Sequence, residues 1–582
     1  MLRSACVRAL PLVVLAVLAL GQATAALQCA GRGWLEIGLH NRNMAAVHAR
    51  ALAAADPDHR MYGKFLTFSE VKELVHDPAS LLAVENYLRL HDIVAQRSDI
   101  VVSLDGQWVT VPTPVCNADA VASAVQADLA PHVGRVHVHA VDVDVSTHGV
   151  EAQYARGRVR DRAAAAMTSP DSVPSTWPPG PPTTTLMTLK DVRAYYNITE
   201  PSPSPPSGKL ATAAVFEVNA LEFNGEIVER YNPPDTASFQ KLCGLPISPV
   251  TNFKGDNVTL GCLEYTCAEP NLDVELLRAI APWATFTYWS TNLPNSGTTN
   301  AMLVWLMRLA NDPSPSFVQS MSWGPGEAGH PTSLLMRMEE EFAKLAARGV
   351  TFVTSSGDDG VNDRTARGNP SACGLAPQYP ATSAWVTTVG GTMGPEFSKR
   401  ERTAATDAPR KSVITSGGGF STVYPQPSYQ RAAVQGYLSR MAGTSTLPPT
   451  STFNSSNRAY PDVALLANNI DTIVNQAYFP GSGTSASAPL FAGMVTRVLQ
   501  QRLDQGLPPL GLLNVRLYKL ANTPASPFND ITVGDNHCTG IYGPQQNHTC
   551  CPYGFTATKG FDPLTGLGSV DYPKFLKALT TN

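Results

Sequence analysis

The sequence lacks a long apolar run beyond its first residues, and it lacks an excess of charge of either sign. Charged residues make up only 15% of the 582 residues, and the formal net charge is −4. This balance provides no basic surface of the kind that binds nucleic acid. No stretch after the first residues reaches the roughly 18 apolar residues that a membrane-spanning helix needs. We therefore expect neither a nucleic-acid partner nor a membrane span.

The first 25 residues have the pattern of a secretory signal peptide. Arg3 and Arg8 flank the start of an apolar run from Leu10 to Leu20, and Ala23-Thr24-Ala25 is a small-residue cleavage site. The run is too short to cross a bilayer, which favours a leader that is removed. Acceptor triplets for N-glycosylation predict a glycoprotein of the secretory pathway. These triplets begin at Asn197, Asn257, Asn454 and Asn547.

The sequence also lacks a pair of Cys-x-x-Cys motifs, so no cysteine-based zinc site is expected. One of the ten cysteines, Cys6, leaves with the signal peptide, and the remaining nine would meet an oxidising compartment. Disulfides are expected there. Cys262 and Cys267 are close enough to form a local bridge, and so are members of the group Cys538, Cys550 and Cys551. An odd count leaves at least one thiol free or intermolecular.

A proline-rich stretch divides the chain into two unequal parts. Residues 168–187 are rich in proline and poor in aliphatic side chains, which predicts an extended linker. The preceding residues, 26–167, have the order β-α-β-β-α-β of a ferredoxin-like α+β domain, with Asp105-Gly106 as a hairpin turn. Its strands are expected over 35–39, 100–104, 107–111 and 136–145, and its helices over 44–55, 67–75, 80–90 and 118–129.

The larger part, residues 188–582, alternates short apolar strands with longer amphipathic helices. Strands that are apolar along their whole length indicate a mostly parallel sheet covered by helices on both faces. We therefore predict a single large α/β domain. Its clearest strands are expected over 212–218, 317–323, 350–356 and 385–391, and its clearest helices over 300–311 and 333–349.

One short stretch of this domain, GSGTSASAPLFAG at 481–493, places Ser485 between two glycines and an apolar helix. Small neighbours leave room for a substrate backbone. The N–H groups and the positive end of the helix dipole point at the serine oxygen and at any oxyanion beside it. This geometry is typical of the nucleophile of serine peptidases. The alternative is a serine that only caps a core helix.

A serine nucleophile needs a base, and the large domain has little histidine to supply one. Nine of the 12 histidines lie at or before His148. Only His330, His537 and His548 follow the linker, and none begins a His-Gly-Thr motif. The base is therefore another kind of group, or the site is inactive.

Three carboxylates are candidates for this chemistry. Glu269 and Asp273 are four residues apart, so they share one face of a helix that begins near Pro270. Asp358 follows an apolar strand, at the carboxyl end where α/β folds place their sites. The alternatives are two solvated acids at a helix start and an ordinary turn aspartate.

Together these stretches resemble the sedolisins, serine-carboxyl peptidases with a subtilisin-like fold and an acidic pH optimum. The matching motifs are Gly-Thr-Ser-Ala-Ser at 483–487, Glu-x-x-x-Asp at 269–273 and Ser-Gly-Asp at 356–358, together with YPATSAWVTTVGGT at 379–392 and SGGGFS at 416–421. The resemblance implies that Ser485 is the nucleophile, Glu269 its general base and Asp273 the group that orients Glu269. It makes Asp358 the carboxyl group that donates to the oxyanion. Asp359 departs from the usual serine, and a second carboxylate there would raise the pKa of Asp358.

The resemblance reaches the N-terminal part, where DPDHRMYGKFLTFSEVKELV at 56–75 is similar to the family's prodomain signature. It implies a zymogen whose prodomain is an intramolecular inhibitor and chaperone, cleaved near 170–188. We further expect protonation of His137 and His139 on one strand to help release the prodomain. The family's single structural Ca²⁺ maps to carboxylates of Asp530 and Asp562 and to backbone carbonyls of Ile531, Thr558 and Gly560.

The function that follows is an acid-active peptidase acting on peptides or unfolded proteins. The resemblance implies a monomer that removes tripeptides from free N-termini, in a lysosome or acidic vacuole, or after secretion. One alternative is an endopeptidase of the same family. The other is a catalytically inactive secreted binding protein with the same fold.

Overall fold

The computed structural model describes two compact units. Unit 1 comprises Met1–His40, Asp77–Glu151 and Pro294–Thr299, and unit 2 comprises Asn41–His76, Ala152–Leu293 and Asn300–Asn582. The predicted signal peptide and nearly all of the predicted linker lie outside the described residues. None of the described helices is long and apolar enough to span a membrane. The described residues are 32–94, 96–114, 118–141, 186–199, 208–219, 230–256, 258, 260–262, 266–292, 301–541 and 548–581.

Unit 1 is built on a four-stranded antiparallel sheet in the order β2-β3-β1-β4. This order and the two helices of the unit confirm the ferredoxin-like prediction. Leu35 and Ile37 of β1 are fully buried in a core that also contains Val84, Leu88 and Val125 from the two helices. The elements are β1 Arg32–Leu39, α4 Pro78–Leu90, β2 Val101–Val102, β3 Trp108–Pro114, α5 Ala118–Asp128 and β4 Val133–Val141.

Two helices that precede α4 in the sequence belong to unit 2. They are α2 (Met44–Ala55) and α3 (Phe68–Val75), and α2 packs against α12 (Thr332–Ala347). The backbone N–H of Leu66 donates to Ala347 O at 2.8 Å. The hydroxyl of Tyr62 accepts from Arg502 at 2.9 Å. Residues 41–76 are thus held against the large α/β fold by both apolar and polar contacts.

The centre of unit 2 is an eight-stranded sheet in the order β11-β10-β9-β8-β5-β7-β6, with β14 paired to β10. Every pair is parallel except β10 with β11, which confirms the predicted parallel sheet. The strands are β5 Thr212–Asn219, β6 Asn252–Gly255, β7 Thr285–Asn292, β8 Val318–Met321, β9 Thr351–Ser355, β10 Thr387–Met393, β11 Arg402–Thr403 and β14 Val463–Leu466.

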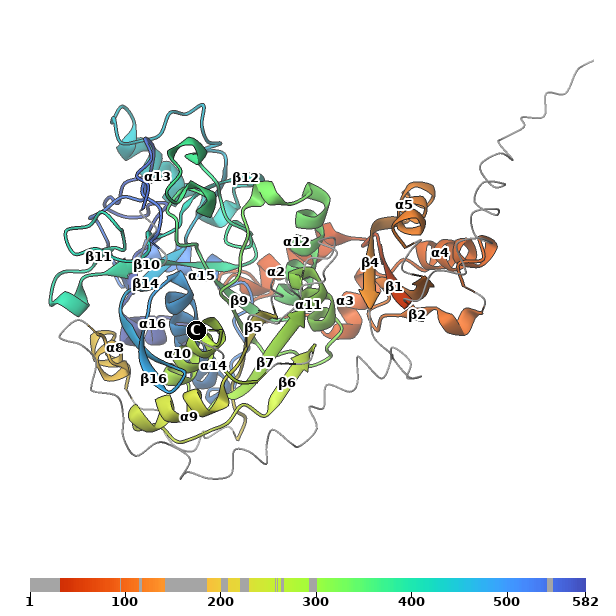
Figure 1. Ribbon diagram of the computed structural model, residues 1–582, viewed down its shortest axis with the longest axis horizontal. Helices are drawn as coiled ribbons and strands as arrows, with labels where there is room; N and C mark the ends of the chain where they lie inside the picture. The colour runs from red at the N-terminus through yellow and green to blue at the C-terminus, as the bar shows by residue number, and fades with distance from the viewer. Residues whose placement is uncertain are drawn as a thin grey trace, which may run out of the picture. The chain divides into compact units, whose positions relative to one another are not determined.

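Helices α10 (Ala268–Ile280) and α14 (Thr484–Asp504) form a packed pair against this sheet, and α14 contacts β5, β8, β9, β10 and β14. Helix α11 (Ala301–Ala310) contacts β5, β7 and α12, and in Figure 1 α11 and α12 lie on the other side of β5 from α10 and α14. The remaining elements are α8 Leu189–Tyr195, α9 Pro233–Leu242, β12 Gly419–Pro425, α13 Arg431–Met441, β13 Asn457–Tyr460, β15 Ile470–Val474, β16 Ala477–Gly481, α15 Asn514–Ala521, β17 Phe528–Asn529, β18 Ser569–Val570 and α16 Tyr572–Thr580.

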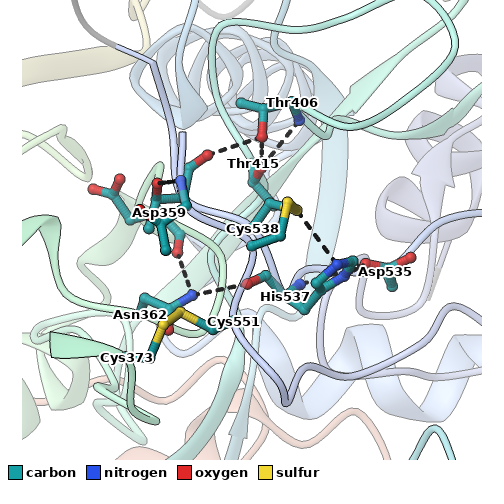
Figure 2. The surroundings of a disulfide bond; sticks show 12 residues. Asp359, Asn362, Cys373, Thr406, Thr415, Asp535, His537, Cys538 and Cys551 are labelled. Atoms are coloured by element: carbon teal, nitrogen blue, oxygen red, sulfur yellow. Dashed lines mark hydrogen bonds and ion pairs between the residues drawn. A yellow bond between two sulfur atoms is a disulfide. The ribbon is translucent and has the colours of Figure 1, made fainter. Parts of the chain in front are cut away.

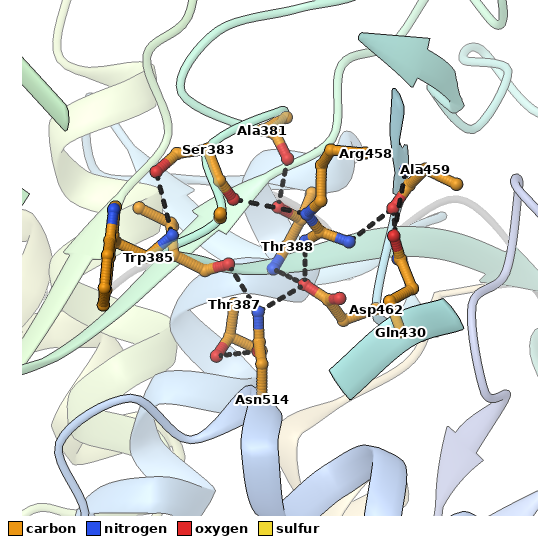
Figure 3. Close-up of polar contacts among 12 residues, drawn as sticks. Ala381, Ser383, Trp385, Thr387, Thr388, Gln430, Arg458, Ala459, Asp462 and Asn514 are labelled. Carbon is orange, nitrogen blue, oxygen red and sulfur yellow. Dashed lines mark hydrogen bonds and ion pairs between the residues drawn. The ribbon is translucent and has the colours of Figure 1, made fainter. Parts of the chain in front are cut away.

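A buried polar network joins β10, β13, α15 and the short link between β13 and β14 (Figure 3). Arg458 and Asp462 are both fully buried and form an ion pair at 2.6 Å. The Asp462 carboxylate also accepts from Thr388 N at 2.8 Å and from the Tyr518 hydroxyl at 2.9 Å. Because a buried charge is costly without partners, these hydrogen bonds fix how the four elements meet.

Disulfides secure the loops of unit 2. Cys262–Cys267 and Cys538–Cys550 confirm the two predicted local bridges. Cys551 pairs instead with Cys373, 178 residues earlier in the chain, and Figure 2 shows this bridge beside Asp359 and Asn362. Among the described cysteines, Cys243 is the free thiol that the odd count requires.

Candidate active site

The predicted nucleophile lies at the N-terminus of the longest helix described. Ser485 is the second residue of α14, and it is partly exposed between the buried residues Thr484 and Ala486. Gly483 precedes the helix with φ 144°, a conformation that favours glycine. A Cβ atom at Gly483 would lie 3.3 Å from Asp358 Oδ2 and 3.5 Å from Ser485 Cβ. The Asp358 carboxyl and Ser485 therefore both lie next to this glycine.

Asp358 is held by the residue next to the nucleophile. Its Oδ1 accepts from the backbone N–H of Thr484 at 2.8 Å and from the Thr484 hydroxyl at 2.9 Å. The same hydroxyl accepts from Gly357 N at 3.1 Å. Oδ2 lies on the side of Gly483, where a Cβ atom on that glycine would be 3.3 Å away.

Helix α10 brings Asp273 to the same place. Pro270 lies in its first turn, as predicted, and the helix begins at Ala268. Asp273 is fully buried, and its Oδ1 accepts from the Ser322 hydroxyl at 2.7 Å. The Ser322 hydroxyl also lies 3.5 Å from the backbone oxygen of Ser485. Ser322 thus connects Asp273 to the nucleophile.

Glu269 lies one turn earlier on α10, in the first turn of the helix and on the face that carries Asp273. It is partly exposed, in contrast to the fully buried Asp273. The two helices that carry these residues are in contact along their length. Gly481, just before α14, lies against Leu272, and Gly493 lies against Leu277. The first half of α10 therefore lies beside the residues that lead into α14, and the approach of Glu269 to Ser485 stays a prediction.

The sequence analysis missed two residues of this cluster besides Ser322. Glu217 of β5 is fully buried and lies close to the side chain of Asp273. The indole N–H of Trp323 donates to Glu217 Oε2 at 3.0 Å. A signal was available, because Glu217 is the only charged residue in the apolar strand 212–219. A lone acid in a buried strand calls for a polar partner.

Burial controls the electrostatics of this cluster. It raises the pKa of Asp273 to about 7, although the hydrogen bonds with Ser322 and Glu217 act in the opposite direction. Burial disfavours the ionised form of Asp273, so this carboxyl group keeps its proton under acidic conditions. Asp273 can then hydrogen-bond a neighbouring carboxylate without repelling it.

Histidine takes no part in these contacts. Among the described residues, no hydrogen bond joins Ser485 to an imidazole. The ring of His537 instead pairs with Asp535 in a C-terminal loop. That the base of the site is a group other than histidine stays a prediction.

The residue after Asp358 has a partner of its own. Arg367 donates two hydrogen bonds of 2.6 Å to the Asp359 carboxylate, one to each oxygen, and Gly540 N donates a third at 2.9 Å. The sequence suggested that Asp359 would act on Asp358 as an isolated negative charge. The arginine compensates that charge instead.

The predicted calcium ligands come from two loops that meet. The Asp530 carboxylate accepts from Gly560 N at 3.1 and 3.0 Å, and Asp562 Oδ2 accepts from Thr558 N at 3.0 Å. Asp562 is fully buried, and within the described loops neither carboxylate forms an ion pair with lysine or arginine. Carboxylate and carbonyl oxygens, with Ile531 next to Asp530, form a donor set that suits Ca²⁺.

Comparisons with known proteins give the family and the relatives of this chain. Residues 33–130 match the model of the pro-kumamolisin activation domain, and residues 277–512 match that of the subtilase family. Tripeptidyl-peptidase 1 of Bos taurus is 30% identical over 588 residues, covering 94% of this chain and 91% of the relative. The Mus musculus protein of that name is 31% identical over 561 residues with the same coverage. A solved structure of Pseudomonas sedolisin, a serine-carboxyl proteinase, is 23% identical, covers 69% of this chain and all of that one, and gives a TM-score of 0.49.

Proposed function

The chain belongs to the sedolisin-type serine peptidases that include tripeptidyl-peptidase 1, and we propose that it removes tripeptides from free N-termini under acidic conditions. Ser485 is the proposed nucleophile. The observation that carries the proposal is that Ser485 and the Asp358 carboxyl both lie next to Gly483, with Asp273 tied to the same place through Ser322.

In the proposed first step, Glu269 takes the proton of the Ser485 hydroxyl while the serine oxygen bonds to the scissile carbonyl carbon. Asp273 orients Glu269 by a hydrogen bond. Because burial raises the pKa of Asp273 to about 7, Asp273 remains neutral in acid and leaves the negative charge on Glu269. A carboxylate base suits acidic conditions, under which an imidazole would already be protonated.

The carbonyl oxygen becomes an oxyanion in this step, and protonated Asp358 donates to it from Oδ2. The two hydrogen bonds from Thr484 to Oδ1 hold the carboxyl in place for this role. When the tetrahedral intermediate collapses, the leaving amine takes the proton from Glu269. A water molecule, deprotonated by the same base, then hydrolyses the acyl ester and releases Ser485.

The N-terminal part acts in this proposal as an inhibitor and folding aid that is removed by cleavage near 170–188. Its match to an activation domain and the packing of residues 41–76 on the large fold support this role. The side chains of His137 and His139 lie outside the described residues, so their part in release stays a prediction. We expect the activated enzyme in a lysosome or other acidic compartment, or outside the cell.

We also propose one structural Ca²⁺, held by the carboxylates of Asp530 and Asp562 and by the carbonyl groups of Ile531, Thr558 and Gly560. When bound, the ion would supply positive charge that joins the two loops. Chelation with EGTA should therefore lower the melting temperature, and added Ca²⁺ should restore it. In the Asp562→Asn variant, EGTA should have little further effect.

One experiment separates the candidate activities. The acid-activated protein is incubated at pH 4 to 5 with a peptide that has a free N-terminus and with its N-acetylated form, and products are identified by mass spectrometry. The proposal expects successive tripeptides from the free peptide only, and no products with the Ser485→Ala variant. Internal cleavage of the acetylated peptide would identify an endopeptidase. Absence of any cleavage that depends on Ser485 would identify a binding protein.

A further inference from the structure

The turn that carries Asp358 is fixed on one side by backbone hydrogen bonds. Thr415 N donates to Asp358 O at 2.9 Å, and Gly417 N donates to Gly357 O at 2.7 Å. Gly360, which has φ 61°, donates to Thr415 O at 3.0 Å. These contacts hold residues 357–360 along the segment 415–417. All of them are between backbone atoms, so they do not involve the side chain of Asp359.

The Asp359 carboxylate holds the turn through different partners. Both of its oxygens accept from Arg367, at 2.6 Å each, and both side chains are 11% exposed. Oδ1 also accepts from Gly540 N at 2.9 Å, and the Gly540 Cα faces Asp358 O closely enough that a Cβ there would lie 2.8 Å from it. Gly540 therefore connects the Asp359–Arg367 ion pair to the backbone of Asp358, the proposed oxyanion residue.

We propose that the Asp359–Arg367 ion pair positions the turn that carries Asp358 and keeps the net charge beside Asp358 at zero. This inference rests on the proposed oxyanion role of Asp358. Asp358 must be protonated to donate, so an uncompensated charge next to it changes the pH range in which the enzyme works. Asp359 and Arg367 are positioning residues here, because neither touches the nucleophile.

Other charged groups follow this turn in the chain or lie in the neighbouring loop, among them Asp363, Arg364 and Asp407. The loop behind Asp359 carries the pair Asp535 and His537, and His537 O accepts from Asn362 at 3.1 Å (Figure 2). From α14 the turn meets only the uncharged Thr484 and Ser485, and the segment 415–417 contributes no charge. Glu269 on α10 is the proposed base. Among the described ion pairs, Asp359–Arg367 is the one whose acid adjoins Asp358 in the chain.

The test uses four variants of the full chain, activated by acid: Arg367→Gln, Asp359→Asn, the double variant, and Arg367→Lys. Arg367→Gln leaves one negative charge beside Asp358 and favours its protonated form, so the alkaline limb of kcat should move to higher pH. Asp359→Asn leaves one positive charge, and the limb should move to lower pH. Each shift should be on the order of 0.5 to 1 pH unit. The double variant should return the limb to its wild-type position.

Positioning is read from kcat and KM. Arg367→Lys keeps the charge but loses the bidentate contact, so its limb should stay in place while kcat falls by about tenfold with KM unchanged. Arg308→Gln is the matched control, because Arg308 pairs with Asp256 at 2.9 Å between α11 and the end of β6. Its pH profile should match that of the wild type.

Three results overturn the inference: a limb that stays in place in both single variants, single variants that shift in the same direction, or an unchanged kcat in both Arg367→Lys and the double variant. A proposed function that is wrong gives a different result, namely a wild type without any cleavage that Ser485→Ala abolishes. Thermal unfolding then tests the Asp359–Arg367 ion pair by itself. A double variant about as stable as either single variant supports the pair. If the stability lost in the double variant equals the sum of the losses in the two single variants, the pair is contradicted.

Discussion

Among single residues, Asp358 has the most specific chemical requirement, because it must carry a proton in order to donate to the oxyanion. Asparagine donates at every pH, so we expect Asp358→Asn to keep part of the activity and to move the alkaline limb of kcat toward pH 7, where Asp273 ionises. Alanine removes the donor, and kcat should fall by roughly 10² to 10³. The measurement is kcat against pH for both variants.

Thr484→Ser is the control for this pair of variants, because it keeps the backbone N–H and the hydroxyl that bind Asp358 Oδ1. It should retain the wild-type limb. Equal losses in the asparagine and alanine variants, with no change in the limb, would mean that Asp358 only supports the loop.

The sequence predicts roles for Ser485, Asp358, Glu269 and Asp273 because each lies in a motif a few residues long. It did not identify Ser322, which follows β8, because a serine after a strand carries no local signal. Its role follows from the side-by-side arrangement of β8, α10 and α14, which bring residues 322, 273 and 485 together from distant positions in the chain. Such contacts depend on register and packing rather than on spacing.

Among the elements, the α10–α14 pair depends on a small residue at the crossing. A Cβ on Gly493 would lie 2.6 Å from Ile280 Cβ and 3.0 Å from Leu277 O, and neither atom can move unless α10 moves. We expect Gly493→Ala to destabilise the protein by about 1 to 3 kcal/mol. Because α10 carries Glu269 and Asp273, kcat should fall as well.

Gly436→Ala on α13 is the matched control for Gly493→Ala. Its nearest neighbour is the flexible end of Arg440 at 3.2 Å, and alanine favours a helix over glycine by about 1 kcal/mol. Its melting temperature should be unchanged or higher. A Gly493→Ala variant that is as active and as stable as this control would show that the two helices can separate at no cost.

The network of Figure 3 gives a second prediction for the elements. Asp462→Asn removes the partner of the fully buried Arg458 and should destabilise the protein by roughly 3 to 5 kcal/mol, measured by denaturant unfolding. Replacing both residues, as in Arg458→Met with Asp462→Leu, should cost less than Asp462→Asn alone, because no charge is left buried. A double variant that is less stable than the single one would contradict this account.

Element boundaries were predictable where the cause is local. Thr67 and Glu70 form the expected capping box of α3, with Glu70 N donating to Thr67 at 3.2 Å, and Thr188 with Asp191 does the same for α8. Both boxes lie within four residues of sequence. That residues 41–76 belong to unit 2 was not predictable, because it depends on how α2 meets α12 and on Tyr62 reaching Arg502.

For the whole molecule, buried acids predict how stability depends on pH. Burial raises the pKa of Asp273, Glu339 and Asp471 to about 7 each, whereas the same groups in the unfolded chain lose their protons near pH 4. Between these values the folded protein binds more protons than the unfolded one. The free energy of unfolding therefore falls as the pH rises from about 4 to 7 and then levels off.

His48 acts in the opposite direction, because burial lowers its pKa and acid therefore favours the unfolded form. The three acids together change the free energy of unfolding more than the one histidine does. The melting temperature should therefore be at least about 5 °C higher at pH 5 than at pH 8. The measurement uses the Ser485→Ala protein, which cannot cleave itself. Asp471→Asn should reduce that difference, since asparagine has no proton to lose. A melting temperature that rises from pH 5 to pH 8 would mean that these acids are ionised in the folded protein, and Asp273 could then not serve as the neutral partner of Glu269.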